Sequence, residues 1–212
     1  FKNKFKQFLM KLFFLYFNTI KRLKLIQIFY RFLYFFYIPK FKIINTPISI
    51  KKRDKWIFSI RKKDSINNEN NFYILNNIIE YKNKKNWESK TIDKLLLYHI
   101  HYFDYINFGQ NNNKVQLHTN LINEYINYKK NLKFVGLDPY PVSLRIVNWI
   151  KWSIENNYSE KLFLKTIISE AHYLSKRIEW HILGNHLFKN AKALIFAGLF
   201  FSNNIVAKKL YY

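Results

Sequence analysis

The stretch SEKLFLKTIISEAHYLSKRIEWHILGNHLFKNAKALIFAGLFF, residues 159–201, decides the fold class. Its apolar residues recur at spacings of three and four on both sides of a single break at Gly184, and this is the period of an amphipathic helix. We predict one helix over residues 159–180, with Gly184 at a left-handed position beyond its end. Asn185 is then the expected N-cap of a second helix that runs to about Phe201.

Three further helices are predicted upstream from the same spacing: residues 91–108, residues 117–130, and a segment from Pro141 or Ser143 to about Asn156. Thr91 is the expected N-cap of the first of these. Successive helices of similar length joined by short turns predict an all-α fold, with the pairing of a partial (α/α) toroid or a solenoid. The 212 residues include only four Gly and four Pro, which argues against a turn-rich all-β protein.

The first 40 residues alternate basic and apolar groups at helical spacing. One face holds Phe5, Phe8, Leu12, Tyr16 and Ile20. We predict an amphipathic helical extension over residues 1–40, with a second helical piece from Leu23 to Tyr37. Two interpretations of this extension stay open: it packs on the following domain as surface helices do, or it binds a membrane surface.

Residues 41–90 are irregular and polar, and we expect a connector with little β structure there. Short strands are expected at residues 43–44, 48–50 and 56–60, and an Asn-rich loop at residues 64–71. The helical array then occupies residues 91–212.

The net charge of +23 favours an anionic partner, such as an acidic glycan, an anionic lipid or a nucleic acid. Most of the 36 basic residues are Lys, and Asn, Ile, Phe and Tyr are abundant too, so a skewed residue usage explains the charge equally well. Nothing beyond charge supports a nucleic acid, and we do not expect one. The chain has no Cys, no helical His pair at zinc spacing and no phosphate-binding Gly loop, so we expect neither a metal nor another cofactor.

The helix after Pro141 has two stripes. The apolar one holds Leu144, Val147, Ile150 and Ile154, and the other holds Arg145, Asn148, Trp149 and Trp152. The second stripe shares one face, because its spacings are three and four. A cation, an amide and two indoles suit an acidic sugar, since Arg pairs with a carboxylate or sulfate. The alternative is two buried Trp side chains with Arg packed over them.

The step Asn185-His186 also has two interpretations. A His takes up or releases a proton near neutral pH, and an Asn amide donates to a carboxylate. At the start of a helix both would lie where the backbone favours an anion, which suits abstraction of a proton next to a carboxylate. The alternative is that Asn185 only caps the helix and His186 is a packed polar residue.

Three motifs connect these residues to a known family: LYHIHYFDY at 97–105, PYPVSLRIVNWIK at 139–151 and EWHILGNHLFKNAKAL at 179–194. In these motifs the chain resembles the N-terminal helical part of the heparinase II/III family of polysaccharide lyases. Residues 18–31 are also similar to the leader of bacterial relatives. The resemblance covers most of the chain, and the two longer motifs are its more specific part.

The resemblance implies an incomplete (α/α) toroid followed by a β-sandwich domain, and carbon–oxygen cleavage of uronate-containing glycans by β-elimination. In that family an Asn neutralises the uronate carboxylate, a Tyr or His removes the C5 proton, and a Tyr protonates the leaving oxygen. Asn185 and His186 are the expected catalytic residues. The expected acidic-polysaccharide contacts are Arg145, Asn148, Trp149, Trp152 and Tyr102.

The chain begins with Phe1 and ends at Tyr211-Tyr212 in a helical-looking stretch, so we expect a portion of a longer protein. The resemblance places the proton-transferring Tyr later in the toroid and a further His in the β-sandwich domain, the expected partner of this portion. We therefore expect these 212 residues to be inactive alone, and the family favours a periplasmic or cell-envelope location. Two other functions stay open: a non-catalytic glycan-binding or surface-polysaccharide assembly protein on the same fold, and a basic peripheral membrane protein that binds through residues 1–40.

Overall fold

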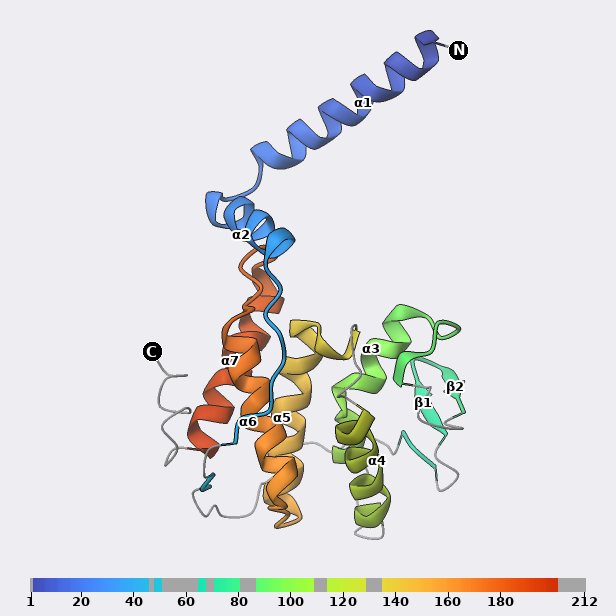
Figure 1. The fold of residues 1–212 in the computed structure, drawn as a ribbon. Helices are drawn as coiled ribbons and strands as arrows, with labels where there is room; N and C mark the ends of the chain where they lie inside the picture. Colours follow the sequence, from blue (N-terminus) through green and yellow to red (C-terminus); the bar gives the residue numbers. More distant parts are fainter. Residues whose placement is uncertain are drawn as a thin grey trace.

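The computed structural model describes residues 2–45, 48–50, 65–67, 71–80, 87–108, 114–128 and 135–201. Within this part the helices are α1 (Lys2–Lys21), α2 (Leu25–Phe36), α3 (Lys94–Tyr102), α4 (Val115–Tyr128), α5 (Pro139–Glu155), α6 (Lys161–Ser175) and α7 (Gly184–Phe200). The strands are β1 (Phe72–Ile74) and β2 (Asn77–Ile79), and they pair antiparallel. The chain is therefore mostly helical, and the prediction of an all-α fold is confirmed (Figure 1).

Helix α3 is shorter than the sequence predicted. Its N-cap is Asp93 rather than Thr91, because the Asp93 carboxylate accepts a hydrogen bond from the backbone N–H of Leu95 at 2.8 Å. The helix ends at Phe103, which has a φ of 53°. The chain then continues as a short 3₁₀ turn over Asp104–Asn107.

The break between α6 and α7 is longer than predicted. Helix α6 ends at Ser175 instead of residue 180, and α7 already begins at Gly184. The N-cap of α7 is Leu183, so the expectation that Asn185 caps this helix is wrong. Asn185 is the second residue of the helix. Its side-chain amide does not cap the helix and is available for other contacts.

Helices α3, α5 and α7 run in the same direction, side by side across the body (Figure 1). Residue numbers rise together along both helices of each contacting pair. Between α3 and α5 the contacts are Tyr98–Asp138 and Tyr102–Asn148. Between α5 and α7 they are Tyr140–Asn185 and Ser143–Asn190. Helices α4 and α6 run antiparallel to α5. The contacts of α4 with α5 are His118–Trp152 and Tyr125–Arg145. Those of α6 with α5 are Phe163–Trp152 and Glu170–Arg145. Direction therefore alternates along the chain from α3 to α7, as it does in helical hairpins.

The small sheet belongs to the same core as the helices. The two residues of its turn, Leu75 and Asn76, both have positive φ values, as a tight two-residue hairpin requires. Phe72 packs edge-on against Tyr105 at 4.9 Å between ring centroids. Trp87 is fully buried and stacks on Phe103 at 5.4 Å. The core of the helical array therefore includes residues that precede residue 90, such as Phe72 and Trp87.

The strands expected elsewhere in the connector are not found where the structure describes it. Residues 43–44 and 48–50 have no regular structure. The third expected strand, at residues 56–60, lies outside the described residues.

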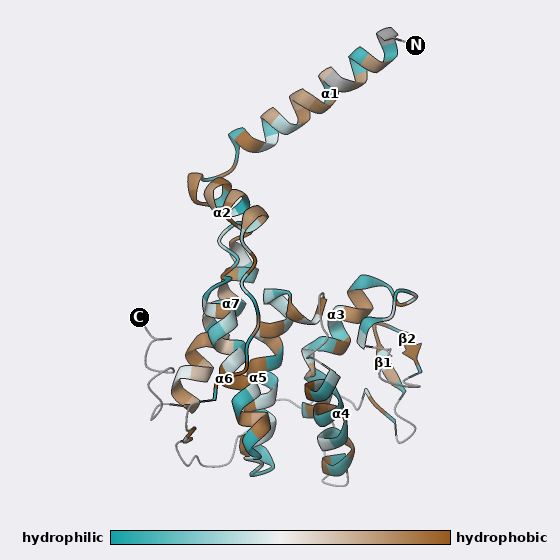
Figure 2. Cartoon of the chain, viewed as in Figure 1, coloured by the Kyte–Doolittle hydropathy of each residue, from teal (hydrophilic) through white to brown (hydrophobic). Residues whose placement is uncertain are grey.

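The N-terminal extension forms two helices, as predicted. Helix α2 lies against the turn between α6 and α7, where the Tyr34 hydroxyl donates to the carbonyl of Ile178 at 2.8 Å and the Tyr30 ring lies 6.0 Å from Trp180. Helix α1 projects away from the body (Figure 1). Figure 2 shows hydrophobic residues along much of both helices. No helix in the described part of the chain is both long enough and apolar enough to cross a membrane.

Candidate functional site

Three of the expected sugar-binding side chains lie in the core. Arg145 and Trp149 have no exposed surface, and Trp152 is 1% exposed. They have no surface to present to a glycan, so the prediction that they bind substrate is wrong. The interpretation of buried indoles with an Arg packed over them is the correct one, because α5 is covered by helices on several sides.

Arg145 has partners for all of its guanidinium nitrogens inside the core. Its Nε and Nη2 donate to the Glu170 carboxylate at 2.9–3.1 Å. Its Nη1 donates to the carbonyl of His101 at 3.0 Å, and Nη2 also donates to the carbonyl of Gly136 at 2.8 Å. The guanidinium lies 4.7 Å from the centre of the Tyr125 ring. Arg145 therefore joins α3, α5 and α6 and has a structural role.

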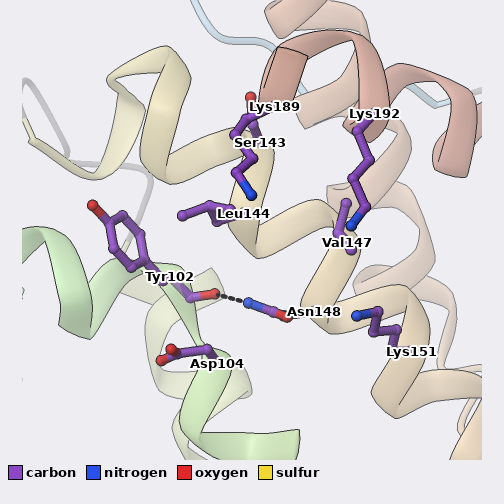
Figure 3. A pocket seen from close by; sticks show the side chains of 9 residues that line it. All are labelled: Tyr102, Asp104, Ser143, Leu144, Val147, Asn148, Lys151, Lys189 and Lys192. Carbon is purple, nitrogen blue, oxygen red and sulfur yellow. Dashed lines mark hydrogen bonds between the residues drawn. The ribbon is translucent and has the colours of Figure 1, made fainter. Parts of the chain in front are cut away.

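Asn148 and Tyr102, the remaining expected contacts, do line a pocket. The pocket has a volume of about 200 Å³ and opens between α3, α5 and α7. Figure 3 shows the Asn148 amide directed toward the Tyr102 carbonyl, to which it donates at 2.9 Å. The other residues that line it are Asp104, Ser143, Leu144, Val147, Lys151, Lys189 and Lys192.

The charged residues that line this pocket are mainly basic. They are Lys151, Lys189 and Lys192, with one acidic residue, Asp104. Burial lowers the pKa of Lys151, and the nearby charges of Lys192 and Lys189 lower it further. A Lys151 charge that burial and two neighbouring cations disfavour indicates a site that a bound anion would stabilise.

The start of α7 has an unusual backbone. Leu183 has φ 65° and ψ −155°, and Gly184 has a φ of 53°. The first conformation is almost restricted to Gly and costs on the order of 1–3 kcal/mol at a Leu. Such strain occurs most often at functional sites. Here it directs the chain so that Asn185 and His186 lie at the N-terminal turn of α7, where Asn185 is exposed.

His186 is held by a buried carboxylate. Its Nδ1 lies 3.0 Å from Oε1 of Glu179, a residue that is 5% exposed. The other oxygen of Glu179 accepts from the Asn190 amide at 3.1 Å, and Asn190 also donates to the Ser143 hydroxyl at 2.9 Å. A carboxylate next to Nδ1 favours the tautomer with the proton on that nitrogen. The Nε2 of His186 is then left to accept a proton or a hydrogen bond.

Tyrosine rings connect His186 to the pocket. The Tyr140 ring packs against His186 with 4.4 Å between centroids, and its hydroxyl accepts a hydrogen bond from the Asn185 amide at 3.3 Å. The Tyr102 ring lies 5.9 Å from Tyr140 on the other side. Burial raises the pKa of the Tyr102 hydroxyl above its ordinary value, so this group keeps its proton at any physiological pH.

The catalytic candidates and the lysines share one surface. Asn185, Lys189 and Lys192 lie at spacings of four and three along α7, and Tyr140, Asn148 and Lys151 at spacings of eight and three along α5. The Asn185 amide contacts Tyr140, and the other four side chains line one pocket, so these two stripes form one face. It extends for roughly 10 Å along α7, at 1.5 Å per residue. We call this face, from Asn185 to Lys192, the α5–α7 face.

Glu179, Tyr140 and the three lysines were not among the site residues predicted from the sequence. The lysines had a signal, since two of them repeat on the Asn185 side of α7 at helical spacing. Glu179 had none, because it lies in an irregular turn and only the fold brings it to His186. No group of three His, Cys, Asp or Glu side chains that could hold a metal ion occurs in the described part of the chain.

Comparisons of the chain with protein-family models, with curated proteins and with solved structures found no match.

Proposed function

We propose that this chain is the substrate-binding helical part of a polysaccharide lyase that acts on uronate-containing glycans. The observation that supports the proposal best is the start of α7. There an exposed Asn185 lies beside His186, which a buried Glu179 orients, and Lys189, one turn further along α7, lines the pocket. The alternation of direction from α3 to α7 supports the further proposal that these helices are an arc of an (α/α) toroid.

In this proposal Asn185 binds the uronate carboxylate. Its amide now donates to the Tyr140 hydroxyl at 3.3 Å, a long hydrogen bond that a charged acceptor would replace favourably. The N-terminus of α7 adds its positive dipole. Partial neutralisation of the carboxylate lowers the cost of removing the adjacent C5 proton, which is the difficult step of a β-elimination.

His186 is oriented for proton transfer. Glu179 holds Nδ1, so the free Nε2 can accept the C5 proton or bind the sugar. Glu179 is a positioning residue, since it acts through His186. The hydroxyls of Tyr140 and Tyr102 border the same face and can donate hydrogen bonds to sugar oxygens. The resemblance assigns protonation of the leaving oxygen to a Tyr from a later part of the toroid.

The lysine pocket gives the site its preference for acidic glycans. A polyuronate or sulfated chain that extends from Asn185 along the α5–α7 face would place its next anionic group near Lys189 and Lys192. The same site without the later Tyr and His would bind such a glycan and leave it intact. That outcome would favour the non-catalytic glycan-binding protein over the lyase.

Binding of an oligosaccharide by the whole chain tests the site. The probe is a hexuronate-containing oligosaccharide, and its carboxyl-reduced form is the neutral control. We expect Asn185→Ala to weaken binding of the acidic probe about tenfold or more, since a hydrogen bond to a charged group contributes roughly 1.5–3 kcal/mol. The matched change Asn120→Ala, at an exposed position on α4, should have no effect.

Because Asn185→Ala leaves the net charge of +23 unchanged, it separates site binding from general attraction. Equal affinity for the acidic and the carboxyl-reduced probe would refute the proposal. In a protein that carries the toroid to its end, elimination is followed at the ultraviolet band of the unsaturated uronate. An undiminished rate in Asn185→Ala would exclude the assigned role.

A further inference from the structure

Helix α2 is amphipathic in the opposite sense to an ordinary surface helix. Its polar and mixed side, with Gln27, Tyr30 and Tyr34, contacts the body: Gln27 donates weakly to the carbonyls of His181 and Ile182 at 3.4 Å, and Tyr34 donates to Ile178. The opposite side consists of Leu25, Phe29, Phe32 and Phe36, at spacings of four, three and four. These side chains are 84%, 60%, 67% and 68% exposed. A contiguous apolar surface of this kind is rare on a soluble monomer and marks a binding surface.

Helix α1 continues the apolar surface. Described apolar side chains along its length are exposed, including Phe5, Phe13, Phe17 and Ile20. A narrow polar strip runs along one side through Lys4, Gln7, Lys11 and Asn18. The helix contacts no other helix or strand in the described part of the chain closely enough to cover these side chains.

Charge identifies the occupant of this surface. Residues 1–50 contain eight Lys and two Arg but no Asp or Glu. Lys4 and Lys11 border the apolar surface of α1, Lys21 ends this helix, and Arg22 and Lys24 lie in the turn before α2. Basic residues that border a face rich in Phe and Leu are the pattern of helices that lie in the interface of an anionic bilayer. A protein partner of apolar character would not require the complete absence of acidic residues.

We propose that α1 and α2 bind this protein to an anionic lipid surface, with the rings of Phe29, Phe32 and Phe36 inserted among the acyl chains. The contacts of Tyr34 and Gln27 fix α2 to the turn before α7, so the bilayer would hold that turn close to itself. The inference is independent of the proposed lyase function, since it uses none of the residues of the α5–α7 face.

Vesicle binding of the whole chain tests the proposal, with phosphatidylcholine vesicles that contain phosphatidylglycerol and with phosphatidylcholine alone. Net charge by itself would attract the chain to the anionic vesicles, so the decisive variants keep the charge. We expect Phe29→Ser with Phe32→Ser to weaken binding roughly a hundredfold, because each inserted ring contributes about a factor of ten. The matched control is Phe188→Ser with Ile195→Ser on α7, where the side chains are 63% and 51% exposed; this control should bind as the unchanged chain does.

The absence of Cys permits a second measurement. An environment-sensitive dye is attached at Phe36→Cys or, as control, at Phe188→Cys. We expect the emission of the dye at position 36, and not at 188, to shift to the blue with anionic vesicles. Each of the following would overturn the proposal: the α2 double variant floats with vesicles as well as its control, or the dye at 36 does not respond. A dimer in vesicle-free solution that the α2 double variant abolishes, with no vesicle binding, would assign the surface to a second copy of the chain.

Discussion

Replacement of Arg145 by Met tests whether this side chain stabilises the core or binds a sugar. A sugar-binding Arg would be exposed, and its loss would reduce affinity but not stability. The loss of a buried core Arg would reduce stability. The structure places the guanidinium at zero exposure, with the Glu170 carboxylate, the His101 carbonyl and the Gly136 carbonyl as its acceptors.

The expected loss of stability follows from these acceptors. Removing one partner of a buried ion pair costs roughly 3–5 kcal/mol, because the remaining charge stays in a medium that solvates it poorly. Two buried carbonyls also lose a donor, at about 1–3 kcal/mol each. Relaxation and entering water reduce the sum, so we expect the free energy of unfolding to fall by about 5 kcal/mol. That is a large part of the 5–15 kcal/mol typical of a domain.

Guanidinium titration followed by far-ultraviolet circular dichroism measures this loss, provided that the slope of the transition is unchanged. Arg31→Met, the same change at an exposed position of α2, should alter stability by no more than about 0.5 kcal/mol. The double variant Arg145→Met with Glu170→Met should be more stable than Arg145→Met alone, because it leaves no uncompensated charge.

Two results would refute this assignment. The first is an Arg145→Met variant within about 1 kcal/mol of the unchanged chain, together with weaker binding of the acidic oligosaccharide. The second is a double variant whose loss equals the sum of the two single losses, since that would show no coupling between Arg145 and Glu170.

Two more predictions concern Gly136 and Lys151. Gly136→Ala should lower the free energy of unfolding by about 1–3 kcal/mol, because the new Cβ would lie 2.8 Å from Cε1 of a buried His101 ring that the Trp87 carbonyl holds at 2.9 Å; an unchanged thermal midpoint would contradict this. Lys151 has a lowered pKa in the free pocket, and a bound anion would raise it, so binding takes up a proton at alkaline pH. Affinity for the acidic oligosaccharide should therefore fall as pH rises toward the ordinary lysine pKa of about 10.5, and Lys151→Gln should flatten this fall; a flat profile with Lys151 present would exclude the pocket from binding.

The sequence alone was sufficient for most of the helices. Apolar residues at spacings of three and four predicted α4, α5 and α7 to within a few residues, because helix formation depends on contacts between residues that are near in sequence. Helix ends were less predictable. Asp93 and Thr91 are both good caps, and only the backbone geometry selected Asp93.

The helices of the N-terminal extension could also be predicted from residues that are near one another in the sequence. The spacing predicted two helices before residue 40, and α1 and α2 are there. It could not show that α2 turns its tyrosines to the body and its phenylalanines outward. That orientation depends on carbonyl groups around Ile178 and His181, about 150 residues away in the chain.

Some residues of the candidate site could be predicted from the local sequence, and others only from the packing of distant segments. Asn185 and His186 were found from their place at a helix start and from the motif around them. The lysine pocket and Glu179 required the packing of α5 against α7, which brings residues near 145 beside residues near 190.

What the sequence determined by itself was the helical period and the break at Gly184, both of which follow from the steric preferences of a few neighbouring residues. What only the tertiary structure decided was which face of each helix is covered. Helix α5 has neighbours on several sides, so each of its two stripes has buried members and a one-sided amphipathic pattern does not apply. Arg145 is buried because it pairs with Glu170, 25 residues later, inside the core. Lys151 lines a pocket because side chains of α3, α5 and α7 leave a space between these helices.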